Sequence, residues 1–218
     1  FSEWIVFVTE VSLILAYFLT WKTWGARNKA QHIAFGFGLA AASWLTMVII
    51  VAILGFMMDP GSWTEQRSFW RGVVNPVYLP QLMFRTPLAM IMAGLLALLL
   101  VPFFTERGAF RHRAIRFTSI WTLAWSVPCI AGAGFYWLVI PESMKDNMAV
   151  ALATQAFQNW HTAVAQILAV AAAGIIVISL WGVLKPAWLP RPMAVVPLIL
   201  VFLLLGYFER VREFVRKP

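Results

Sequence analysis

The sequence predicts an all-α integral membrane protein with six transmembrane helices and both termini on the outer, periplasmic side. Hydrophobic residues make up 61% of the 218 residues and charged residues only 12%, and the mean hydropathy is +0.79. A soluble domain of this size could not bury so much apolar surface. The composition excludes a soluble enzyme, a disordered chain and a collagen-like fibre. We expect residues 1–218 to form a single transmembrane helical-bundle domain.

Six stretches are apolar enough to cross a membrane, since a spanning helix needs about 20 mostly apolar residues. They are residues 4–22, 31–57, 82–104, 117–140, 157–184 and 193–208. Turn-forming residues break the chain between them at Asp59-Pro60-Gly61, Asn75-Pro76, Pro141-Glu142, Lys185-Pro186 and Pro190-Arg191-Pro192. Because the chain begins directly in the first stretch, without a signal-peptide n-region, we expect a processed or split piece of something larger.

The distribution of basic residues predicts the orientation. Lys plus Arg number 17 and Asp plus Glu 9, for a net charge of +8. The first, third and fifth connections carry nine bases and one acid, whereas the second and fourth carry three bases and four acids. Basic residues collect on the cytoplasmic side of a membrane, so both termini should face outward. The four bases of the tail, Glu209–Pro218, run against this rule, but one tail rarely outweighs three loops.

Cysteine and tryptophan usage limit the cofactors. The single cysteine, Cys129, excludes an internal disulfide and a CxxCH haem attachment, and with it a c-type haem bound by this chain. Twelve tryptophans are present, and six lie near span ends: Trp21, Trp24, Trp63, Trp70, Trp160 and Trp188. Two interpretations stay open, an aromatic belt at the membrane surface and packing against large flat cofactors.

Ionisable residues inside the apolar stretches are candidate functional residues, because lipid tolerates them poorly. Glu3 and Glu10 are seven residues apart, which puts them on one helix face about 10 Å apart, and Tyr17 continues the stripe. Such a stripe could carry protons. Alternatively, Glu3 is merely interfacial and Glu10 pairs with a basic neighbour.

Arg85 and His161 each allow two interpretations. Arg85 stays charged, so it either pairs with a haem propionate or carboxylate, or extends to the outer interface. His161 lies above Ala165, Ala169 and Ala172. These small residues leave room either for a macrocycle ligated by the imidazole or for a closely packed helix.

The remaining charged candidates are two histidines and the tail. His32 lies at the inner end of the second stretch, in the opposite leaflet from His161, so the two cannot ligate one haem. His112 lies in a basic loop and should be solvated. Glu209 with Glu213, and Arg212 with Arg216, are spaced i,i+4 on a continuing helix, which also fits an ordinary charged helix end.

Several of these segments together resemble the haem subunit (subunit I) of the cytochrome bd-type quinol oxidase superfamily, in particular divergent members that work with c-type cytochromes. The most specific block runs from Phe69-Trp70-Arg71-Gly72 through Asn75-Pro76-Val77-Tyr78-Leu79-Pro80 to Phe84-Arg85-Thr86. Glu3-Trp4 to Glu10 and Gln31-His32-Ile33 are similar to the family's third and fourth helices. The tail keeps a Glu-x-x-Arg-x-Pro spacing at Glu213 and Arg216. The match covers the family's third to eighth helices.

The resemblance implies haem-binding roles and a proton path. The implied haem-binding residues are His161, Glu213, Arg85, Arg216 and His32, with His161 and Glu213 as metal ligands; Glu3 and Glu10 would line the proton path. The family's first two helices are missing, with the histidine that ligates the oxygen-reducing haem. Arg85 stands where the oxidases have a low-spin haem ligand, and the quinol-binding loop is reduced to about Pro141–Gln158. These departures argue against oxygen reduction by this chain alone and against quinol oxidation at the usual place.

We therefore expect a non-autonomous subunit of a respiratory oxidoreductase complex in the bacterial inner membrane. It would bind or flank b-type haem, which a partner chain could share, and pass electrons between the quinone pool and c-type cytochromes, with quinone as a second candidate cofactor. Its partners would be c-type cytochrome subunits and membrane subunits that supply the missing helices. Two alternatives stay open: a haem-free membrane scaffold that anchors cytochrome or dehydrogenase subunits, and a transporter or channel. Transporters often contain two repeated halves, and this sequence shows no such duplication, which argues against transport.

Overall fold

The computed structural model shows an all-α architecture over the residues that it describes, which are 2–146, 155–189 and positions 195, 198–199, 201–203 and 206. Every regular element in these residues is a helix. Five of these helices are long and apolar enough to cross a membrane. The multi-pass, all-α membrane architecture that the composition predicts is thus found in the described residues. The sixth predicted span, 193–208, lies mostly outside them.

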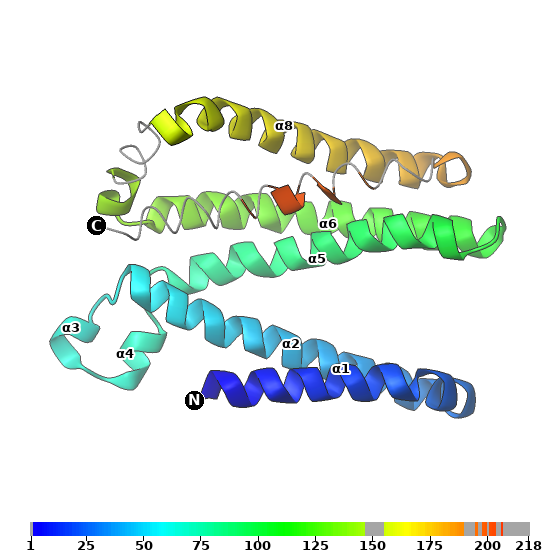
Figure 1. Cartoon of the computed structure of the whole chain (residues 1–218), viewed down its shortest axis with the longest axis horizontal. Coiled ribbons are helices and arrows are strands. Elements are labelled where there is room, and N and C mark those ends of the chain that lie inside the picture. Colours follow the sequence, from blue (N-terminus) through cyan, green and yellow to red (C-terminus); the bar gives the residue numbers. More distant parts are fainter. Residues whose placement is uncertain are drawn as a thin grey trace. The chain divides into compact units, whose positions relative to one another are not determined.

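The chain forms two compact units, residues 1–82 and 83–218, and each is described by itself. In unit 1, α1 (Ser2–Arg27) and α2 (Lys29–Met58) lie side by side as an antiparallel hairpin (Figure 1). The hairpin turns at Asn28, whose Oδ1 accepts a hydrogen bond from the backbone N–H of Gln31 at 3.2 Å. This side chain caps α2 and satisfies one of its free N–H groups.

The connection after α2 folds as the sequence predicts at its first turn. α2 ends at Met58, and the Asp59 carboxylate accepts a hydrogen bond from the Gly61 N–H at 2.8 Å. Gly61 has a φ of 53°, in the left-handed region that favours glycine. Two short helices follow, α3 (Trp63–Gln66) and α4 (Phe69–Val73), and the Trp63 ring packs edge-on against Phe56 of α2 at 5.2 Å.

Unit 2 contains most of α5 (Tyr78–Phe104), with α6 (Ala109–Val139), α8 (Gln155–Leu184) and the 3₁₀ turn η1 (Pro186–Trp188). α6 and α8 lie side by side (Figure 1). Two buried hydrophobic clusters hold this unit together. One contains Leu98, Ile115, Ile178 and Leu189, and the other Ile91, Leu95, Cys129 and Val201.

Three helix boundaries lie four or more residues from the ends of the predicted spans. α6 begins at Ala109, eight residues before the predicted span 117–140, and α5 begins at Tyr78 rather than 82. α1 continues to Arg27 rather than ending at 22. In each case the extra turns carry charged or polar residues, so the apolar stretch is shorter than the helix. The hydrogen-bonded backbone continues past the apolar segment into the interface.

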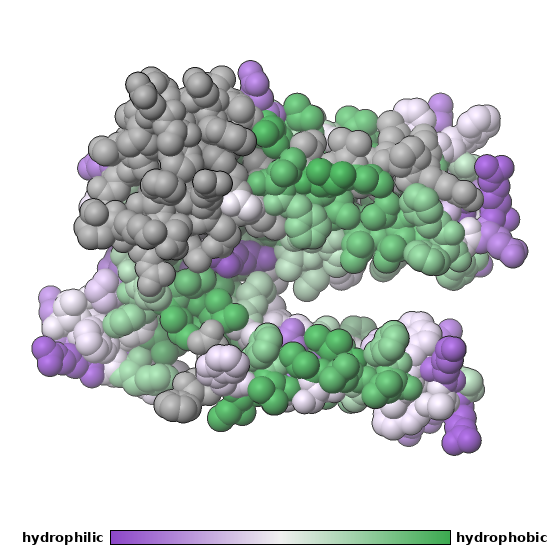
Figure 2. All heavy atoms as spheres, in the orientation of Figure 1, coloured by the Kyte–Doolittle hydropathy of each residue, from purple (hydrophilic) through white to green (hydrophobic). Residues whose placement is uncertain are grey.

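The sides of the long helices expose large hydrophobic residues. Figure 2 shows hydrophobic atoms along the helix flanks and hydrophilic atoms at helix ends. No residue of α1 between 4 and 27 is buried within the chain. Its large apolar side chains Trp4, Ile5, Phe18 and Leu19 are each more than two-thirds exposed. Exposed apolar surface on this scale requires lipid or other transmembrane helices around it.

Candidate functional site

The α1–α2 hairpin contains a line of polar and aromatic contacts between otherwise apolar helices. We define the α1–α2 seam as Glu10 and Tyr17 of α1 with His32 and Ser43 of α2. Glu10 and Tyr17 are seven residues apart, close to two helical turns, and His32 and Ser43 are eleven apart, close to three. Each pair therefore lies on one face of its helix, and the two faces meet.

Glu10 is the acidic residue of the seam. Its Oε1 accepts a hydrogen bond from the Ser43 Oγ at 2.7 Å. The sequence left open whether Glu10 pairs with a basic neighbour, and the structure instead gives it a neutral hydroxyl donor. This contact joins two polar side chains across an otherwise apolar pair of helices, with a hydroxyl rather than a cation beside the carboxyl group.

His32 is the most buried ionisable residue of the seam. It is only 5% exposed, and its imidazole stacks on the Tyr17 ring with centroids 4.3 Å apart and planes 12° from parallel. Trp21 lies against it at 5.2 Å, nearly perpendicular. Neither His32 nitrogen has a hydrogen-bond partner in the part of the chain that the structure describes. Buried polar atoms are rarely left unpaired, so these nitrogens are candidates to bind a group from outside the chain.

The close approach of the two helices depends on Gly36. A Cβ at this position would lie 3.1 Å from Cε2 of Tyr17. Gly36 follows His32 by one turn, so the missing side chain leaves space for the Tyr17 ring beside the imidazole. Phe35 and Trp24 extend the aromatic cluster, with ring centroids 6.0 Å apart.

A second buried polar residue, Asn75, forms hydrogen bonds that link α2 to the segment before α5. Asn75 is 4% exposed; its Nδ2 donates to the carbonyl of Ala52 at 3.3 Å, and its Oδ1 accepts from the Val77 N–H at 3.2 Å. A Cβ at Gly55 would lie 2.6 Å from this Oδ1. Asn75-Pro76 is one of the predicted breaks between apolar stretches, and the asparagine has a structural role just before α5.

The other predicted site residues are less completely defined. Arg85 is half-buried on α5, one residue after Phe84, whose ring stacks with Tyr136 at 6.2 Å. Glu3 lies on α1 and His161 on α8, but their side chains are outside the described set. Glu213 and Arg216 lie outside the described residues altogether.

The structure brings together Glu10, Tyr17 and His32, and it adds Ser43, which sequence reasoning missed. A signal for Ser43 exists in the sequence. Glu10 precedes the hairpin turn at Asn28 by 18 residues and Ser43 follows it by 15. Two polar residues at similar distances from a hairpin turn lie at similar depth in antiparallel helices, so they can meet.

The described residues contain no group of three His, Cys, Asp or Glu side chains placed to hold a metal ion. No family model, curated protein or solved structure matches the chain.

Proposed function

We propose that the chain is a multi-pass subunit of a respiratory electron-transfer complex in the bacterial inner membrane, related to the haem subunit of the bd-type oxidases. The observation that carries this proposal is the α1–α2 seam, where His32 is buried with both nitrogens unpartnered among the described residues and Glu10 is hydrogen-bonded to Ser43. Ionisable groups in a membrane helix are costly and usually serve charge movement or cofactor binding. The resemblance of the block from Phe69 to Thr86 indicates the same class of protein.

His32 is one of the residues proposed to hold b-type haem. Tyr17 covers a face of its imidazole, and both ring nitrogens are buried without a hydrogen-bond partner among the described residues. A neutral imidazole binds iron through a ring nitrogen. His161 and Glu213 would ligate haem iron, and His32 and Arg216 would contact haem, which a partner chain could share. Haem would supply one-electron transfer, while the protein sets its position and potential.

Two further polar residues have proposed roles. Arg85 would pair with a haem propionate, since a guanidinium stays charged and forms bidentate contacts with carboxylates. Glu10 would hold a proton received through Glu3 from the outer side, with Ser43 stabilising either protonation state. Proton uptake and release at such a carboxyl would compensate the charge of an electron that arrives at the haem.

The expected partners are those of the bd-type family that the sequence resembles. Another membrane subunit would supply the two helices that precede this segment in the bd-type family. Cytochrome c subunits would exchange electrons with the complex on the outer side, and the quinone pool would be the other electron partner. The exposed flank of α1 is suited to contact such a subunit, since no residue between 4 and 27 is buried within the chain.

The test is a reduced-minus-oxidised absorption spectrum of the purified complex, with His32→Ala, His161→Ala and a control, His112→Ala. The control removes a partly exposed imidazole from the basic first turns of α6. We expect b-type haem in the parent complex, a loss of haem signal in at least one of the first two variants, and no change in the control. Absence of b-type haem from the parent complex would refute the proposal. Unchanged haem content and electron transfer in both histidine variants would instead favour the haem-free scaffold.

A further inference from the structure

One end of unit 2 combines five basic residues with an apolar pocket. We define the basic end as Arg107, Arg111, Arg113, Arg116 and Lys185. The four arginines lie just before or within the first turns of α6, and Lys185 follows the last residue of α8. The acid Glu106 is the single negative charge in this part of the sequence. The positive-inside rule places this end at the cytoplasmic leaflet.

The arginines and Lys185 come together because α6 and α8 pack antiparallel. A Cβ at Gly182 would lie 3.3 Å from Cγ2 of Ile115, so the start of α6 meets the end of α8. Ile115 also shares a buried cluster with Leu189, which follows η1 directly. Arg111 precedes Ile115 by four residues and therefore lies on the same face of α6.

Arg111 has an unusual environment for a guanidinium. Its exposed fraction is only 6%, and its Nη1 has no hydrogen-bond partner among the described residues. A buried cation without an anionic partner is unfavourable. Glu106, the acid of this part of the sequence, is exposed and forms no ion pair with Arg111. The unpartnered Nη1 of Arg111 is therefore a candidate to bind an anion from outside the described residues.

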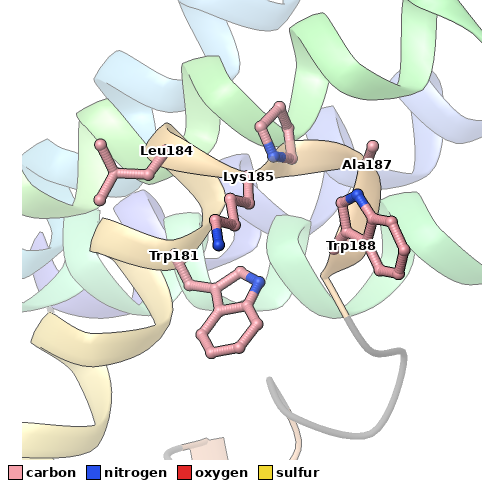
Figure 3. Close-up of a pocket in the computed structure, with 6 residues that line it drawn as sticks. Trp181, Leu184, Lys185, Ala187 and Trp188 are labelled. Atoms are coloured by element: carbon pink, nitrogen blue, oxygen red, sulfur yellow. The ribbon is translucent and has the colours of Figure 1, made fainter.

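The pocket beside Lys185 is lined mainly by apolar side chains. It has a volume of about 610 Å³ and is lined by Trp181, Leu184, Lys185, Pro186, Ala187 and Trp188. Figure 3 shows the Lys185 side chain extending on the same side of the ribbon as the Trp181 indole, with Trp188 beyond the turn. Leu184 and Trp188 are each 76% exposed. An apolar surface with an ammonium group at its edge matches a molecule that has alkyl chains and an anionic head.

We propose that this end of unit 2 binds an anionic phospholipid of the cytoplasmic leaflet. The phosphate would contact Arg111 and Lys185, and an acyl chain would lie along Trp181, Leu184 and Trp188. Arginine is well suited to the phosphate because its planar N–H groups can form two parallel hydrogen bonds. Basic pockets between transmembrane helices on the cytoplasmic side recognise anionic headgroups through this combination of charge and apolar surface.

The experiment uses the full chain, with any subunits that copurify, in delipidated detergent micelles. Phosphatidylglycerol or phosphatidylcholine with brominated acyl chains is titrated in, and tryptophan quenching is recorded. The contribution of the pocket is the quenching that disappears in a Trp181→Phe/Trp188→Phe variant. We expect phosphatidylglycerol to produce this quenching at a concentration at least fivefold lower than phosphatidylcholine.

Variants with single charges removed locate the headgroup. Arg111→Gln and Lys185→Gln should each raise the half-quenching concentration of phosphatidylglycerol about fivefold, and the double variant about 25-fold, because one base near an anionic lipid contributes about this factor. Lys22→Gln is the matched control, because Lys22 is a base near the end of α1 on the same predicted side of the membrane. This variant should change the half-quenching concentration of phosphatidylglycerol by less than about twofold. Lys185 is exposed, so its variant should fold even if Arg111→Gln does not.

Two results would overturn the proposal. One is equal quenching by phosphatidylglycerol and phosphatidylcholine at the pocket tryptophans. The other is a loss of affinity in Lys22→Gln as large as that in Lys185→Gln, which would reveal a general attraction to negative charge. Inorganic phosphate added to the micelles should not displace the lipid, and displacement at equal concentration would assign the site to the free anion instead.

Discussion

Gly132→Ala should destabilise unit 2 because α5 and α6 approach closely at this residue. A Cβ at Gly132 would lie 2.5 Å from the Met83 carbonyl oxygen and 2.8 Å from the Phe84 nitrogen. Both are backbone atoms, so no side-chain rotation can relieve the clash. An ordinary contact begins at about 3.4 Å, so the helices would have to separate. Overpacking of this kind costs about 1–3 kcal/mol, or roughly 2–12 °C in Tm for a chain of this length.

The assay is thermal unfolding in detergent, followed by tryptophan fluorescence. Gly134→Ala is the matched control, because it lies two residues further along α6 and a Cβ there meets nothing within 4 Å. The control should leave Tm unchanged or raise it slightly, since alanine favours a helix over glycine by about 0.5–1 kcal/mol. A Tm for Gly132→Ala equal to or above that of Gly134→Ala would refute the reasoning. The variant should also disturb Arg85, which follows Phe84 in the displaced backbone.

Three further predictions concern unit 1. Asn75→Ala should lower the free energy of unfolding by about 1–3 kcal/mol, because buried backbone groups lose their partner; Asn75→Asp should not rescue it, and full stability of either variant in the same thermal assay would contradict the anchoring role. Gly61→Ala should lower the free energy of unfolding by about 1–2 kcal/mol, because φ at this residue is 53° and a Cβ would lie 2.7 Å from Cδ of Pro76. An unchanged Tm would show that the turn can relax. Ser43→Ala and Glu10→Gln should be coupled by about 0.6–1.7 kcal/mol in a double-mutant cycle of unfolding, and strictly additive effects would mean that their hydrogen bond contributes nothing.

The membrane-spanning helices and one of their turns could be predicted from the sequence because they depend on local properties. Apolar length alone predicts a spanning helix, and Asp59-Pro60-Gly61 has the residues that an Asx turn with a left-handed glycine requires. The start of α6 was placed too late, since Arg111 and Arg113 interrupt the apolar pattern while the helix continues through them. A helix that continues into the interface is therefore longer than the apolar stretch that predicts it.

The contacts of the candidate site depend on which helix faces meet, and a single sequence does not contain that information directly. Glu10 and Tyr17 were predicted to share a face, but Ser43 was not recognised as a partner. His32 was placed correctly near the start of its helix, whereas its stack on Tyr17 requires the hairpin geometry and the glycine at position 36. The haem-binding and proton-path roles stay predictions.

The two contacts of the α1–α2 seam fix the helical register of the hairpin. The Glu10–Ser43 hydrogen bond and the Tyr17–His32 stack lie two to three turns apart, so sliding or rotating either helix breaks both at once. Alkyl side chains elsewhere on these helices would tolerate many offsets, because their packing has little directionality. One residue inserted into α1 between positions 10 and 17 would rotate the flanking segments by about 100° relative to each other. It would therefore separate the acid from the aromatic contact while leaving the hydropathy of the span unchanged.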